Sequence, residues 1–156
     1  MRRFLSIFGA LALIGMAAVG IGLGVLFYKG HALDTESKAF VDNAVPAIAA
    51  SWSTQELLDR GTPELRQVIK LEELKGYFAR LIAQLGPLVQ YEGATGKTNV
   101  HIAGSGSTVA ASYTAKARFE DGIATFRFNL MKRDGRWMIH YFHIDTAPDH
   151  QAGQRT

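Results

Sequence analysis

Hydrophobic and polar positions form three successive patterns along the 156 residues. Residues 4–28 contain no charge, residues 40–85 carry apolar side chains at helical spacing, and residues 99–144 alternate between apolar and polar. As a helix, the charge-free stretch would be about 37 Å long, enough to cross a hydrocarbon core of about 30 Å. The other two patterns predict helices followed by strands. The sequence therefore predicts a transmembrane helix followed by an α+β domain.

Start and stop signals divide the helical part. Ser53, which opens a capping box, and Thr62, which is followed by proline, are the expected N-caps of two helices. Pro46 predicts a kink in the helix before them. The longest helix is expected to end at Gly86. Its apolar stripe comprises Leu71, Leu74, Tyr77, Phe78, Leu81, Ile82 and Leu85.

Two Asp-Gly pairs, at 121–122 and 134–135, predict tight hairpins. Each loop sets a register in which apolar residues fall on one face, as a half-buried sheet requires. The first loop pairs Phe119 with Ala124, Ala117 with Phe126, and Ala115 with Phe128. The second pairs Leu130 with Ile139 and Phe128 with Tyr141.

The last strand changes phase partway along. Trp137, Ile139 and Tyr141 occupy odd positions, whereas Phe142 and Ile144 occupy even ones. Successive side chains of a strand point to opposite faces, so one regular strand cannot direct both sets inward. We therefore expect a β-bulge near residues 140–141.

Four pieces of sequence resemble the cystatin-like cone of the nuclear transport factor 2-like superfamily, in particular small bacterial members with a membrane or signal segment. The pieces are Thr62-Pro-Glu-Leu-Arg66, Leu85-Gly-Pro87, Tyr113-x-Ala-x-Ala-x-Phe-Glu120, and Asp134-Gly-Arg-Trp-Met-Ile139 with Phe142-x-Ile144. The resemblance covers about residues 35–147 and implies helices packed into the concave face of a curved antiparallel sheet. This fold hosts enzymes, binders and scaffolds, so it does not define the function.

The flanking charges predict the orientation in the membrane. Arg2 and Arg3 precede the apolar helix, and only Lys29 directly follows it. The positive-inside rule therefore predicts that the N-terminus is cytoplasmic and that the C-terminal domain is exported. A cleaved signal peptide is the alternative, because residues 30–32 have a small-x-small pattern, although signal cores run only about 7–15 residues. The predicted location is the inner (cell) membrane, single-pass, with a periplasmic or extracellular domain. The expected segments are a cytoplasmic tail at 1–3, the transmembrane helix at 4–28, a linker at 29–34, the cone at 35–147 and a disordered tail at 148–156.

Gly20 and Gly24 form a GxxxG motif within the apolar helix. Small residues at this spacing let two helix backbones approach closely in lipid, which predicts a homodimer or another helical partner. The alternative is that small residues are simply common in membrane helices.

Composition excludes some classes of partner. The chain has 17 basic and 14 acidic residues, and Arg2, Arg3 and Lys29 account for the excess, so the remaining domain is formally neutral. A nucleic-acid-binding domain would carry a basic surface, so nucleic acid is not expected as a partner. The five histidines show no HxxxH or HxH spacing and cysteine is absent, so neither a metal site nor another cofactor is expected.

Candidate ligand-pocket residues are Tyr113, Tyr141, His143 and Asp145. Tyr113 is the only polar residue among the expected inward positions on the strands. His143 and Asp145 share one face of a regular strand and would form an imidazole–carboxylate pair, but the bulge turns them toward solvent. The resemblance implies an Asp, His or Tyr set deep in the cone for an enzyme, and no carboxylate lies there. No catalytic residue is therefore assigned.

Lys116, Arg118 and Arg127 are expected on the outer face of the sheet, with Lys116 opposite Arg127 and Arg118 opposite Thr125. This basic face is a candidate docking surface for an acidic protein or anionic lipid headgroups. The alternative is a soluble sheet surface that discourages strand addition.

The favoured function is a membrane-anchored exported binding or assembly domain without catalytic activity, such as a scaffold subunit. The layout is similar to inner-membrane scaffold subunits of type IV secretion systems. The alternative is a small-molecule carrier or enzyme that uses the cone cavity.

Overall fold

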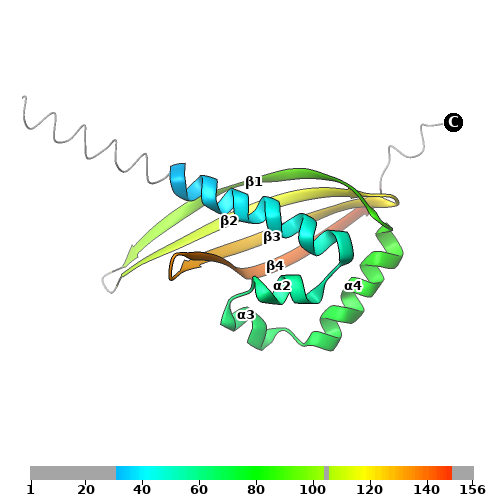
Figure 1. Cartoon of the computed structure of the whole chain (residues 1–156), viewed down its shortest axis with the longest axis horizontal. Coiled ribbons are helices and arrows are strands. Elements are labelled where there is room, and N and C mark those ends of the chain that lie inside the picture. The colour runs from blue at the N-terminus through cyan, green and yellow to red at the C-terminus, as the bar shows by residue number, and fades with distance from the viewer. Residues whose placement is uncertain (1–30, 104–105, 149–156) are drawn as a thin grey trace, which may run out of the picture. The chain divides into compact units, whose positions relative to one another are not determined.

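The computed structural model describes residues 31–103 and 106–148 (Figure 1). The chain divides into two compact units, residues 1–33 and 34–156, and the described residues 31–33 of the first unit are helical. The predicted transmembrane segment at 4–28 lies outside the described residues. Within the described ranges, no helix is long and apolar enough to cross a membrane.

The second unit begins with a helix over residues 34–51, which continues through Pro46. It is followed by α2 (Thr54–Asp59), α3 (Pro63–Val68) and α4 (Leu71–Leu85). Both predicted caps are confirmed, because the Ser53 hydroxyl accepts a hydrogen bond from the Glu56 amide and the Thr62 hydroxyl accepts one from the Leu65 amide. Gly86 ends α4 with a φ of 70°, a backbone conformation that glycine adopts readily.

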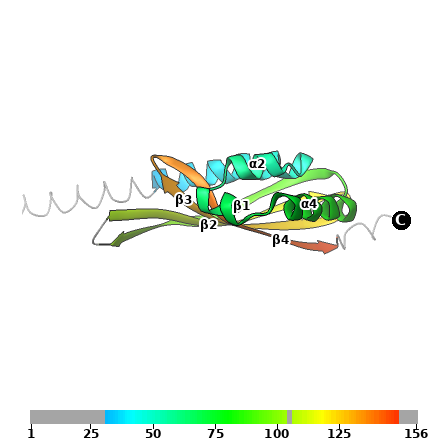
Figure 2. The same ribbon diagram turned by 90° about the horizontal axis from the view of Figure 1, so that it is seen from below.

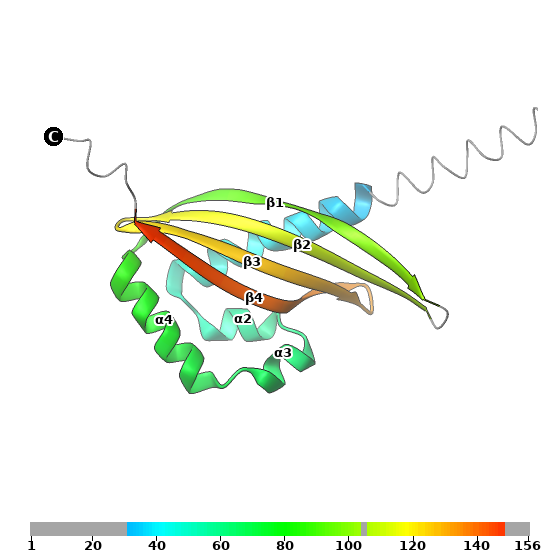
Figure 3. The ribbon, with the colours of Figure 1, turned by 180° about the vertical axis from the view of Figure 1, so that it is seen from behind.

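Four antiparallel strands form one curved sheet in the order β1-β2-β3-β4. They are β1 (Leu88–Ala103), β2 (Gly106–Phe119), β3 (Gly122–Arg133) and β4 (Arg136–Pro148). The helices lie on one face of this sheet, and α3 and α4 flank β4 (Figures 1 and 2). The opposite face, seen from behind in Figure 3, is covered by no helix of the described residues. The predicted α+β class and antiparallel sheet are confirmed.

The core lies between the inner face of the sheet and the helices. Trp52 stacks on Phe119 and Phe126 with ring centroids 5.3 and 6.0 Å apart, and it contacts Phe78 of α4 at 5.5 Å. Alanines on β2 leave room for these rings. The predicted stripe of α4 is only partly buried, because Leu71 is 43% and Ile82 48% exposed. The buried members are Leu74, Phe78, Leu81 and Leu85.

The predicted register between β2 and β3 is wrong by two residues. Ala117 pairs with Ala124 and Ala115 with Phe126, so the turn lies at residues 120–121. The Glu120 amide donates to the Pro87 carbonyl oxygen and the Asp121 amide to the Leu85 carbonyl oxygen, each at 3.0 Å, and these bonds to the end of α4 and the residues after it fix the turn. Gly122 instead belongs to β3, where an added Cβ would lie 2.8 Å from a β4 carbonyl oxygen. A shift of two residues preserves the alternation, so the predicted inner face remains buried.

The second hairpin and the bulge are confirmed. Leu130 pairs with Ile139, and the register then shifts by one residue so that Asn129 pairs with Tyr141. His140 is the extra residue of the bulge. One predicted pair is consequently wrong, because Phe128 faces Phe142 rather than Tyr141.

Candidate functional site

Tyr113 lies on the inner face, as predicted, and is 3% exposed. Its hydroxyl donates to the Asp34 carbonyl oxygen at 3.1 Å and lies 2.9 Å from the Ser37 Oγ. Ser37, itself fully buried, also lies 3.0 Å from the Thr98 Oγ1. The hydroxyl that was predicted to meet a ligand is therefore hydrogen-bonded to the first helix, and this network fastens that helix to β1 and β2.

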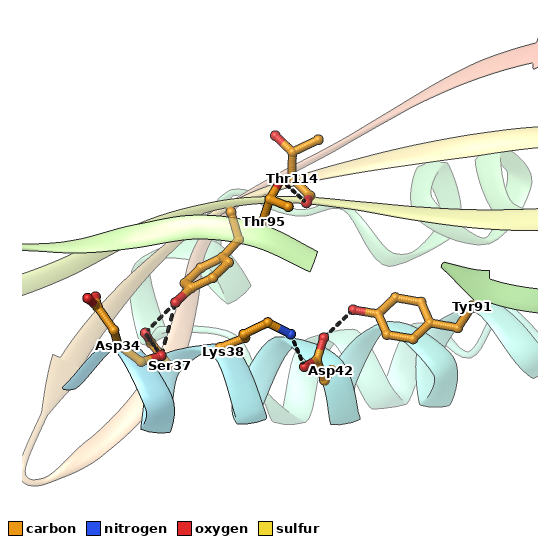
Figure 4. A network of polar contacts seen from close by, with 8 residues as sticks. Asp34, Ser37, Lys38, Asp42, Tyr91, Thr95 and Thr114 are labelled. Carbon is orange, nitrogen blue, oxygen red and sulfur yellow. Dashed lines mark hydrogen bonds and ion pairs between the residues drawn. The ribbon is translucent and has the colours of Figure 1, made fainter. Parts of the chain in front are cut away.

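Two aspartates of the first helix cover the edge of β1. Asp34 Oδ1 accepts a hydrogen bond from the Thr98 amide at 2.8 Å. In Figure 4 the Tyr91 hydroxyl and the Lys38 ammonium group converge on the Asp42 carboxylate. Side chains that occupy an edge strand in this way oppose the addition of another strand.

The Asp42 carboxylate should make the stability of the fold depend on pH in the acidic range. Burial alone would raise the pKa of Asp42, but hydrogen bonds from Lys38, Tyr91 and the Ala94 amide outweigh burial and lower the pKa. A lowered folded-state pKa stabilises the fold above the unfolded pKa of about 3.9, and this contribution is lost as the pH falls through the folded pKa. We expect Asp42→Asn to be less stable than wild type at pH 7, with the difference shrinking below about pH 4. Thermal unfolding between pH 3 and 7 measures this, and a pH-independent difference would contradict it.

The inner face is filled by side chains of the helices. Phe78 and Leu81 of α4 are 2% and 4% exposed, and Phe78 packs edge-on against Phe142 with centroids 6.3 Å apart. Among the described residues, no group of three or more His, Cys, Asp or Glu is arranged to hold a metal ion.

The bulge places Tyr141, His143 and Asp145 on the outer side of β4. The His143 Nε2 lies 3.2 Å from the Asp145 Oδ1, so the predicted pair forms, but both side chains are nearly half exposed. Asp145 also pairs with Arg127 at 2.8 Å. Tyr141 is 48% exposed and does not occupy the inner-face position that the predicted register gave it. These three residues are therefore separated from Tyr113 by the sheet.

An apolar hollow of about 470 Å³ lies where α3 and α4 flank β4, and we call it the β4 hollow. The Tyr77 hydroxyl donates to the Ile144 carbonyl oxygen at 3.1 Å across it. The sequence did not reveal this hollow, because its walls come from two helices, the segment between them and a strand. The only feature of the sequence near this hollow was the change from odd to even apolar positions at Phe142. It is lined by Leu65, Ile69, Leu74, Tyr77, Tyr141, Phe142, His143 and Ile144.

The predicted basic residues lie on the outer face, but they are not opposite one another. Lys116 faces Thr125, and Arg127 faces Thr114, because the true register differs by two residues. Arg118 faces Ile123 and donates to the Gln90 Oε1 at 3.1 Å, while its Nε lies 3.4 Å from Glu92. The charges of Arg118 and Arg127 are thus partly balanced by acidic neighbours.

Gly20 and Gly24, the predicted helix-association residues, lie outside the described residues. Comparisons with protein-family models, with curated proteins and with solved structures found no match. The class of protein is therefore defined by the fold itself: an α+β domain with helices on one face of a four-stranded antiparallel sheet.

Proposed function

We propose that this chain is a single-pass membrane protein of the inner (cell) membrane whose exported domain binds a protein partner and catalyses no reaction. The charge-free stretch at 4–28, preceded by Arg2 and Arg3, supports an anchor with the domain outside. The helices on a curved sheet agree with the cystatin-like cone that the sequence resembles, and membership of that superfamily is part of the proposal. Gly20 and Gly24 would add contact between anchors within the membrane.

The packed interior favours binding at the exterior over a ligand inside the cone. Phe78 and Leu81 occupy the space under the sheet, and the Tyr113 hydroxyl is already hydrogen-bonded. A ligand in the cone would have to displace close-packed side chains, which costs several kcal/mol for a large residue.

The β4 hollow at an unpaired strand edge is the observation that carries the proposal. On this edge the Ile139 amide and carbonyl bond to Arg60 and Thr62, and the Ile144 carbonyl accepts from Tyr77. Backbone groups of alternate residues point to the same edge, so Phe142 directs its amide and carbonyl there as well. No described strand pairs with β4 beside Phe142. An extended apolar segment of a partner would pair with this edge and fill the hollow, as in strand addition.

Single-cysteine labelling tests export and binding together, because the chain has no cysteine of its own. Tyr141→Cys places a thiol at the β4 hollow, and Val89→Cys places a matched control on β1, where Val89 is 59% exposed. A maleimide that cannot cross the inner membrane is applied to cells with that membrane intact. We expect Val89→Cys to react at once, and Tyr141→Cys to react several-fold more slowly than in the purified full-length protein.

The outcomes separate the two parts of the proposal. An unreactive Val89→Cys that becomes reactive only after lysis would show that the domain is not exported. If both thiols react equally slowly with the maleimide in cells, the protection is not specific to the β4 hollow and the binding proposal is contradicted. If Tyr141→Cys reacts as fast in cells as after purification, no partner occupies the β4 hollow.

A further inference from the structure

The outer face of the sheet carries a second hollow, of about 630 Å³, across β1, β2 and β3. We call it the outer-face hollow. Two rows of paired residues cross it, one from Thr95 through Thr114 to Arg127 and the other from Lys97 through Ser112 to Asn129. Alternation along the strands directs these six side chains away from the helices.

The lining of the outer-face hollow is polar and cationic. Its outward side chains are hydroxyls, amides and the cations Lys97 and Arg127, and none of its lining residues is acidic. Tyr113 and Phe128 also border it, but their side chains are buried on the inner face. Such a surface offers hydrogen bonds and positive charge, and the carbon atoms of the same polar side chains supply apolar contact area between them. The hydroxyls, amides and two cations suit a hydroxyl-rich anion, whose carbon skeleton can also contact the apolar parts of these side chains.

The two cations are available to a ligand in different ways. Among the residues that the structure describes, Lys97 is in no ion pair, and it is exposed. Arg127 uses one guanidinium nitrogen for Asp145, and a guanidinium has further N–H donors for a second anion. Asp145 thus orients Arg127 without consuming all of its donors.

The separation of the cations sets the size of the ligand. Lys97 is on β1 and Arg127 on β3, with β2 between them. Strands lie about 4.8 Å apart, so the two backbones are roughly 10 Å apart across the sheet. When both side chains extend over the sheet, a chain with repeated acidic groups can place a separate acidic group on each cation. The intervening Ser112 and Thr114 would then meet neutral hydroxyls of that chain. A single phosphate could bind only where the two side chains converge, and competition by phosphate tests that arrangement.

We propose that the outer-face hollow binds an acidic polysaccharide, with its carboxylates on Lys97 and Arg127 and its hydroxyls on the polar side chains between them. A lipid surface fits less well, because the hollow has no apolar side chain to enter the headgroup layer. The site uses none of the proposed contacts of a partner with the β4 edge, so the two proposals can fail separately.

Binding is measured with full-length protein in nanodiscs of neutral lipid. The probe is an oligogalacturonate of about ten sugar units, compared with maltodextrin of the same length, inorganic phosphate and phosphatidylglycerol vesicles. We expect oligogalacturonate to bind in a salt-dependent manner. Lys97→Gln combined with Arg127→Gln should weaken binding about tenfold or more, because charged hydrogen bonds are lost.

The matched control removes the same charge elsewhere. Lys75→Gln with Arg80→Gln alters two exposed residues of α4 and should leave the affinity within about twofold. Lys97→Gln alone, which breaks no ion pair among the described side chains, tests the site if the double variant is unstable. An unchanged affinity in the Lys97 and Arg127 variants, or an equal loss in the α4 control, would overturn the proposal. So would equal binding of maltodextrin, full competition by phosphate alone, or binding of the vesicles but not of the saccharide.

Discussion

Phe126→Ala is expected to lower the free energy of unfolding by about 3–5 kcal/mol, the range for removing a large buried aromatic side chain. Phe126 is 0% exposed, and its ring lies 6.0 Å from Trp52, 6.3 Å from Phe128 and 6.4 Å from Phe142. The residue opposite it on β2 is Ala115, which cannot fill the cavity. Domains of this size have about 5–15 kcal/mol in total. Denaturant unfolding of the full-length protein in detergent, followed by Trp fluorescence, measures the loss.

Thr125→Ala is the matched control for Phe126→Ala. Thr125 is the neighbouring residue on β3, but its side chain points to the outer face and is only partly buried. Surface substitutions of this kind usually change stability by less than about 0.5 kcal/mol. If Phe126→Ala costs less than about 1 kcal/mol, or if both variants cost the same, the inner face of the sheet has been assigned incorrectly.

The fold class was predictable because local signals agreed with the global pattern. Ser53 and Thr62 start helices through their own side chains, and Gly86 stops one through its own backbone, so these boundaries depend only on adjacent residues. The bulge was predictable for a similar reason. Ile139 and Ile144 are both buried although they have opposite parity, and only an inserted residue permits this.

The register of the first hairpin was not predictable from the Asp-Gly pair. Its turn is fixed by hydrogen bonds to Pro87 and Leu85, which belong to another part of the chain. The first half of β1 was missed for a related reason. Residues 88–97 contain two register shifts and Gly93 with a φ of 100°, so the alternation that marks a regular strand is interrupted there.

The candidate sites depended on this register. A shift of two residues left the side chains of β2 and β3 on their predicted faces, but it replaced the expected Lys116–Arg127 pair by polar neighbours. Contacts such as that of Asp34 with Thr98 join residues 64 positions apart, and no local pattern encodes them. The two hollows arise from the same kind of long-range packing. The sequence therefore identified residues on the outer face, while only the structure brought Lys97 and Arg127 to one surface.

Gly96→Ala is expected to destabilise the fold by about 1–3 kcal/mol, the range for forcing an extra group into a packed site. Gly96 pairs with Tyr113 across β1 and β2. An added Cβ would lie 2.1 Å from the Ser112 carbonyl oxygen and 2.6 Å from the Tyr113 Cδ1. Both neighbours are constrained, the first by the sheet and the second by hydrogen bonds to Ser37 and Asp34. Denaturant unfolding gives the loss.

Gly76→Ala is also a glycine-to-alanine substitution, but it is expected to raise the free energy of unfolding. Gly76 lies within α4, and nothing is within 4 Å of an added Cβ. Alanine favours a helix over glycine by about 0.5–1 kcal/mol, so this variant should gain stability. A Gly96→Ala variant as stable as wild type would mean that the Tyr113 ring does not pack against β1. The hydrogen bonds that fasten the first helix to the sheet through Tyr113 would then be wrong as well, because they require that ring position.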